Sequence, residues 1–106
     1  MEAVPASSGN IMASKSRPYR ESLLEAVADP AEAAHYLSAA IEDSPEMFLK
    51  ALRNVAQARQ MAKVAQEAGI QRESLYRALS SEGNPTLGTL HSVLHALGLK
   101  LTIAAE

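Results

Sequence analysis

The chain has 106 residues, of which 47% are hydrophobic but only 4% aromatic, and it carries 12 acidic against 10 basic side chains. A chain of this length forms one domain, and a core built mainly from leucine, alanine, valine and isoleucine favours an all-α fold. The absence of cysteine excludes disulfides and thiolate metal sites, and no apolar run is long enough to cross a bilayer. The first residues also lack the apolar core of a secretory signal, so we expect a cytoplasmic protein with no membrane contact.

The first half of the chain predicts a flexible start followed by helices. Residues 1–18 are small, polar and aperiodic, so we predict disorder there and a single domain over 19–106. After a short helix to about residue 28, two longer helices are predicted to begin at Asp29-Pro30 and Ser44-Pro45, each a capping residue followed by a proline suited to the first turn. The first of these is expected to bury Ile41 among its apolar residues.

The stretch 61–80 predicts two short helices that meet at a sharp turn, each with an apolar face. Gly69 lies between them, where a left-handed backbone conformation costs least, and Ile70 can fill the angle between the helices. Ala65 lies on the inner face, where a larger side chain would push the helices apart. Together with Leu75, these residues occur at the intervals typical of a DNA-binding helix-turn-helix.

The last part of the chain predicts one more helix and a strand. Thr86 is placed to cap a helix with Leu87 on its core face and Gly98 as its stop. Residues 99–103 alternate apolar and polar side chains, which predicts a β-strand. A lone strand has unpaired backbone groups, and either the same strand of a second copy or another protein's sheet would satisfy them. Packing of its apolar face on its own domain is a compatible alternative.

Several short stretches give the chain a family resemblance: AAIE at 39–42, LKAL at 49–52, GI at 69–70, RESLYRAL at 72–79, GNPT at 83–86 and LGLKL at 97–101. Over roughly residues 19–103 the chain resembles the addiction-module antidote proteins, the HigA-like antitoxins within the lambda-repressor-like (Xre) helix-turn-helix family. The resemblance implies a domain of about five helices with a short C-terminal strand. It also implies an antitoxin that neutralises a RelE/ParE-like toxin encoded beside it, and a homodimer that represses its own operon through a palindromic operator.

The second helix of the 61–80 pair carries the side chains expected to bind double-stranded DNA. With Ile70 inside, Leu75 and Leu79 face inward and the polar residues face outward. Arg72 and Arg77 can each form a fork with guanine or bind a phosphate. Gln71 stands where family members often have serine, so it caps less well but can reach a phosphate or a base edge. The expected contacts are Lys63, Gln71, Arg72, Glu73, Ser74, Tyr76, Arg77 and Asn84.

Each of these contacts has a structural alternative. Glu73 and Arg77, four residues apart, could form a surface ion pair instead. Tyr76 could be a half-buried structural ring, Asn84 a turn residue before proline, and Lys63 a solvated lysine. Because so few cations face the DNA, we expect a homodimer, which doubles the phosphate contacts.

Acidic side chains dominate the region before the helix pair. Between residues 21 and 46 there are seven acidic residues and no lysine or arginine. Such a face repels phosphate and would point away from DNA, so we predict toxin contacts at Glu21, Glu25 and Glu32. A merely solvated surface is an equally good interpretation.

No pattern in the sequence indicates catalysis or a cofactor. His91 and His95 lie four apart but lack a third ligand, so no metal site is expected, and neither a nucleophilic triad nor a phosphate loop occurs. Two other functions remain open. A free-standing Xre repressor would have no toxin gene beside its own. A pure protein inhibitor without DNA reading would fit the balanced charge of residues 61–106, although Arg72 and Arg77 argue against it.

Overall fold

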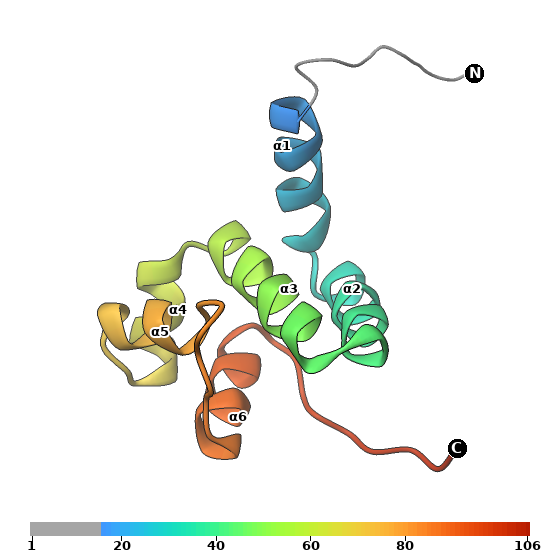
Figure 1. Cartoon of the computed structure of the whole chain (residues 1–106). Coiled ribbons are helices and arrows are strands. Elements are labelled where there is room, and N and C mark those ends of the chain that lie inside the picture. The colour runs from blue at the N-terminus through green and yellow to red at the C-terminus, as the bar shows by residue number, and fades with distance from the viewer. Residues whose placement is uncertain (1–15) are drawn as a thin grey trace, which may run out of the picture.

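Six helices make up all the regular structure of residues 16–106, the part of the chain that the computed structural model describes (Figure 1). They are α1 (Ser16–Val27), α2 (Pro30–Asp43), α3 (Pro45–Ala58), α4 (Met61–Ala68), α5 (Arg72–Ala78) and α6 (Leu87–Ala96). The predicted all-α class is confirmed, and the six helices are those that the residue patterns predict, one more than the family resemblance implies. The short helix expected before Asp29 is 12 residues long. That helix begins three residues before the predicted domain boundary, and the disorder predicted for residues 1–15 lies outside the described residues.

The helix starts lie where the capping residues predict them. The side chains of Asp29, Ser44 and Thr86 accept hydrogen bonds from the backbone N–H three residues further on, at 3.2, 3.0 and 3.1 Å. Pro30 and Pro45 occupy the first turns of α2 and α3, where no backbone donor is needed. Local sequence therefore sets the positions of three of the helices.

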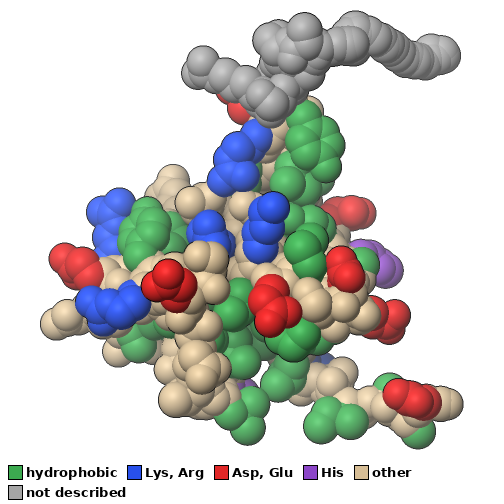
Figure 2. Space-filling model, in the orientation of Figure 1, with side chains coloured by type: hydrophobic (Ala, Val, Ile, Leu, Met, Phe, Trp, Pro, Cys, Tyr) green, Lys and Arg blue, Asp and Glu red, His purple; other side chains and the backbone are tan. Residues whose placement is uncertain are grey.

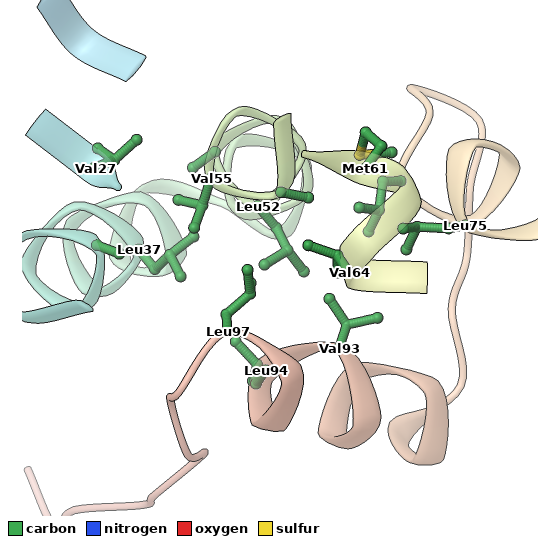
Figure 3. Close-up of a cluster of buried hydrophobic side chains, with 14 of the residues drawn as sticks. Val27, Leu37, Leu52, Val55, Met61, Val64, Leu75, Val93, Leu94 and Leu97 are labelled. Carbon is green, nitrogen blue, oxygen red and sulfur yellow. The ribbon is translucent and has the colours of Figure 1, made fainter. Parts of the chain in front are cut away.

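Helix α3 is the centre of the core. It packs against α1, α2 and α4, while α4 packs against α5 and α6. Figure 3 shows Leu52 and Val55 of α3 between Leu37 of α2 on one side and Val64 of α4 on the other, with Leu94 and Leu97 below. None of the described helices is both long and apolar enough to span a membrane. The most deeply buried large side chains are Leu52, Val55, Val64, Leu75, Leu79, Val93 and Leu97.

Two residues that were expected in the core are exposed. Ile41 is 48% exposed and Leu87 is 69% exposed. Both lie near the end of a helix, Ile41 in the last turn of α2 and Leu87 at the first position of α6. Helical spacing assigns a residue to a face but not to a depth, so it cannot tell where the neighbouring helix stops.

The β-strand predicted at 99–103 is wrong for this chain by itself, because residues 16–106 contain no strand. The Leu99 N–H donates to the Leu94 carbonyl at 2.8 Å and so completes the end of α6. Beyond it, residues 100–106 make no backbone–backbone hydrogen bond within the described part of the chain. A strand needs a neighbour to pair with, and the described residues offer no other strand.

Candidate nucleic-acid interface on α4 and α5

The turn between α4 and α5 has the geometry that the sequence predicts. Gly69 has a φ of 75°, in the left-handed region where glycine has no steric penalty. Its N–H donates to Gln66 at 3.2 Å, and the Ile70 N–H donates back to the Ala65 carbonyl at 3.0 Å. These two bonds close the end of α4 and turn the chain sharply into α5. Ala65 is 2% exposed, so the close approach of the two helices depends on its small side chain.

The inner face of α5 fixes the orientation of the helix. Leu75 and Leu79 are both completely buried. In Figure 3, Leu75 points toward Met61 and Val64 of α4. Since these apolar contacts determine which side of α5 faces inward, they also determine which side chains face solvent. Ser74 is half-buried beside them.

The outer face of α5 presents most of the predicted contacts to solvent. Gln71, Arg72, Glu73 and Arg77 are exposed, and Tyr76 is 40% exposed. Lys63 on α4 and Asn84 after α5 are exposed as well. The structure therefore brings Arg72, Glu73, Tyr76 and Arg77 onto one surface of α5, while Ser74 lies at its edge.

Two local interactions refine this surface. The Arg72 guanidinium carbon lies 5.6 Å from the centre of the Tyr76 ring, within cation–π distance. Gln71 precedes α5 without a side-chain hydrogen bond to the helix, as expected for a weak cap, so its amide is available to another partner. In the described residues no ion pair joins Glu73 to Arg77. The outward side chains of α5 thus form few hydrogen bonds with one another.

The far end of α5 is held by contacts that sequence reasoning missed. Arg53 of α3 donates from Nε to the Leu79 carbonyl at 2.9 Å. The Ser80 hydroxyl donates to the Arg77 carbonyl at 2.8 Å. Gly83 folds back so closely that a Cβ there would lie 2.1 Å from the Ala78 carbonyl oxygen. Together these contacts hold the last turn of α5, and the only sequence signal for Arg53 was a cation beside the apolar stripe of α3.

Cations from α3 extend the basic character of this end of the molecule. Lys50 and Arg53 line a groove of about 260 Å³ together with Glu46, Ser80 and Ser81. On the face shown in Figure 2, lysine and arginine side chains occur at the left and upper centre, with acidic side chains among them. The interface is therefore mixed in charge, and Lys50 joins the candidate phosphate contacts.

Helix α1 is attached to the body by a polar network. The Arg20 guanidinium donates to Asn54 Oδ1 at 3.2 Å and to Gln57 Oε1. Asn54, which is 8% exposed, donates in turn to the Tyr36 hydroxyl at 2.9 Å. Because a buried amide is costly to leave unpaired, this network fixes α1 and α2 against α3.

The predicted toxin contacts lie on α1 and α2. Glu21 and Glu25 are on α1, Glu32 is in the first turn of α2, and all three side chains are exposed.

His91 and His95 of α6 lie with near-parallel rings whose centres are 6.4 Å apart. No group of three potential metal ligands occurs among the described residues.

The fold and this surface define a small all-helical domain in which one short helix, set at a sharp turn after another, presents polar side chains to solvent. The chain belongs to the family of probable addiction module antidote proteins, whose model matches residues 20–105. A protein of Haemophilus influenzae (strain ATCC 51907 / DSM 11121 / KW20 / Rd), described only as uncharacterized, is 48% identical over 62 residues. That alignment covers 58% of this chain and 64% of the relative's length. No solved structure matches the chain.

Proposed function

We propose that the chain is the antitoxin of a type II toxin–antitoxin module, HigA-like and of the Xre class, which neutralises a RelE/ParE-like toxin and represses its own operon. Membership in the family of probable antidote proteins supports the antitoxin role. The observation that carries the DNA-binding part is the two-sided α5, with Leu75 buried and Arg72, Tyr76 and Arg77 exposed. The mechanism consists of binding to two macromolecules, with no catalytic step and no cofactor.

In the proposed DNA complex, α5 lies in the major groove. A recognition helix reads bases with its N-terminal residues, which here are Gln71, Arg72 and Glu73. The stacking of Arg72 on Tyr76 restrains the guanidinium plane before binding, so less rotamer freedom is lost when it forms two hydrogen bonds to guanine. Arg77 lies one turn further along and serves either a base or a phosphate.

The mixed charge of the surface has a consequence for specificity. Glu73 would repel phosphate on random DNA, but it can accept a hydrogen bond from the amino group of cytosine. Lys63, Lys50 and Asn84 would contact the backbone on either side of the groove. With few cations in each copy, non-specific affinity is low, and useful affinity requires a dimer on a two-fold symmetric operator.

The test is a gel shift on the DNA upstream of the gene at two salt concentrations. We expect salt-sensitive binding by the wild type and its loss in Arg72→Ala/Arg77→Ala. The matched control, Arg72→Lys/Arg77→Lys, keeps both charges but removes the planar fork, so it should retain non-specific binding and lose discrimination between operator and unrelated DNA. Circular dichroism would verify that each variant is folded. Absence of binding at low salt by the folded wild type would contradict operator recognition and leave a pure inhibitor.

The toxin would bind the acidic side of the molecule, away from α5. A toxin that acts on RNA or a nucleic-acid complex carries basic residues, and Glu21, Glu25 and Glu32 offer it opposite charge. The test is co-purification with the product of the neighbouring gene after reversal of these three charges to lysine. The control reverses Glu67 and Glu82, which are exposed on α4 and after α5. We expect the triple variant to lose the toxin and the control to keep it, whereas equal retention by both would contradict the acidic interface.

A further inference from the structure

A pocket lies between the first three helices, away from α5. Helices α1, α2 and α3 pack against one another (Figure 1), and the space they leave has a volume of about 430 Å³. This volume is in the range of pockets that hold small molecules. Its apolar wall includes Leu23 of α1, Ala40 of α2 and Met47 of α3. No acidic side chain lines it, although the region 21–46 is rich in them.

A chain of hydrogen bonds with a fixed direction runs along the wall of this pocket. Arg20 carries only donors, so the buried Asn54 must turn its Oδ1 toward the guanidinium, at 3.2 Å. The Asn54 amide nitrogen then donates to the Tyr36 hydroxyl oxygen at 2.9 Å. Because Tyr36 receives this bond, its own O–H remains a donor, and no acceptor for it occurs among the described residues. The chain therefore ends in an unused donor at the pocket.

Lys50 adds a positive charge at the edge of the same pocket. Its side chain is exposed, and it forms no ion pair or hydrogen bond with another described residue. The unused donors of Tyr36 and Lys50 thus stand beside an otherwise apolar wall. A ligand that matches this wall has an apolar body, accepts hydrogen bonds and carries a negative charge. A carboxylate fits, because its two oxygens match two donors, whereas a phosphate brings more charge and more oxygens than these donors can match.

We propose that this pocket binds a small molecule with an apolar body and one carboxylate. The body lies against Leu23, Ala40 and Met47, and the carboxylate accepts from Tyr36 Oη and Lys50 Nζ. A ligand bound in this way contacts all three helices. It therefore stabilises the packing of α1 on α2 and α3, and it raises the melting temperature of the domain by mass action.

The first experiment measures binding to the full chain by isothermal titration calorimetry, without DNA or toxin. The probes are three carboxylates of different length and shape, benzoate, 4-phenylbutyrate and octanoate, each compared with its neutral amide. We expect saturable binding of at least one acid, and about tenfold weaker binding of its amide, because hydrogen bonds to charged groups are the stronger ones. Failure of all three acids to bind, or equal binding of acid and amide, would overturn the proposal.

Matched variants locate the site. Lys50→Met removes the charge and Ala40→Leu fills the pocket from α2, while neither alters the bonds of Asn54. The controls, Lys100→Met and Ala39→Leu, make the same changes at exposed positions outside this pocket. We expect the first two variants to bind the acid about tenfold more weakly or worse, and the controls to bind it as the wild type does. Equal affinity in all four variants, with circular dichroism showing that they are folded, would overturn the pocket.

Tyr36→Phe tests the unused donor directly. It keeps the ring and removes the O–H, so affinity for the acid should fall about tenfold. The melting temperature without ligand would show whether loss of the bond from Asn54 loosens the fold. Unchanged affinity in the folded variant would overturn the role of Tyr36, and if the variant does not fold, Lys50→Met and Ala40→Leu decide.

A carboxylate beside an apolar side chain also occurs at the end of a protein chain. A synthetic peptide with the last residues of the neighbouring gene's product distinguishes this source from a small molecule. We expect the peptide to leave the bound acid in place. Displacement of the acid by the peptide would assign the pocket to the toxin and overturn the small-molecule site.

The ligand has a consequence for DNA binding, because Lys50 lines this pocket and also the groove that contains Arg53 and Ser80. A carboxylate that engages Lys50 neutralises a cation that would otherwise contact phosphate. The acid should therefore weaken operator binding about as much as Lys50→Met does, and should not weaken binding by that variant further. This step rests on the proposed function, whereas binding of the acid does not. Failure of the wild type to shift DNA would contradict the proposed function alone, and a shift that saturating acid leaves unchanged would overturn the coupling alone.

Discussion

The α4–α5 pair encloses its apolar side chains, whereas residues 100–106 leave theirs in solvent. In the pair, Leu75 and Leu79 are completely buried, and every turn is closed by bonds within the chain. In the segment, Ile103 is almost fully exposed and the backbone groups lack partners in the described chain. A helix satisfies its backbone from within, but a strand must obtain half of its bonds from elsewhere. The two regions therefore differ in whether one chain is sufficient to form them.

The sharpest test of this difference is to remove a large side chain from the pair. Leu75→Ala should lower the free energy of unfolding by about 2–5 kcal/mol, because it removes buried contacts and leaves a cavity between α4 and α5. Urea denaturation monitored by circular dichroism would measure it. A loss below about 1 kcal/mol would mean that the pair does not depend on its own core.

The next effect concerns the close return of the chain after α5. Gly83→Ala should lower the free energy of unfolding by about 1–3 kcal/mol, because the new methyl group would overlap backbone atoms of Ala78. The matched control is Gly88→Ala, where the nearest atom to an added Cβ is the Thr86 hydroxyl at 3.9 Å. The control should not lower the melting temperature. Similar losses of stability in both variants would show that the chain at Gly83 does not pack tightly against the end of α5.

A smaller change of opposite sign is expected where α3 meets α4. Gln60 has φ 70° and ψ 109°, and it has the only positive φ of a non-glycine residue in the described part of the chain. Gln60→Gly should raise the free energy of unfolding by about 0.5–1 kcal/mol, because relief of steric strain outweighs the greater freedom of glycine in the unfolded chain. Thermal denaturation would measure this gain, and a decrease in stability would contradict the strain.

The smallest effect on folding should come from the segment. At protein concentrations low enough for the monomer, Leu101→Ala should change the free energy of unfolding by less than about 0.5 kcal/mol, since its side chain is half exposed. Urea denaturation monitored by circular dichroism would measure the change. A large loss of stability would mean that Leu101 contributes to the core despite its exposure.

Local signals in the sequence predicted most of the helices. Asp29, Ser44 and Thr86 cap the helices that they precede, and Gly69 and Gly98 have positive φ where helices end. Each of these effects acts over about four residues, so the local sequence is sufficient to predict where these helices begin and end. The buried and exposed sides of α5 followed from the same short-range spacing.

Contacts between residues far apart in the sequence could not be predicted from the sequence alone. Arg53 binds Leu79, 26 residues away, and Asn54 binds Tyr36 across 18 residues. No periodicity marks such pairs, because they depend on the packing of whole helices. For the same reason spacing misjudged Ile41 and Leu87, which are 48% and 69% exposed. The strand at 99–103 failed for a different reason, since a strand needs another strand to pair with and residues 16–106 contain none.

The three tyrosines give the molecule a set of optical reporters. The chain contains no tryptophan, so tyrosine emission is not lost to a lower-energy acceptor. Tyr76 lies beneath Arg72 on α5, Tyr36 is bonded to Asn54, and Tyr19 is exposed on α1. Single replacements with phenylalanine would assign the emission of each ring. Events at α5 and events at α1 can then be followed separately, without a label, in variants that each keep one tyrosine.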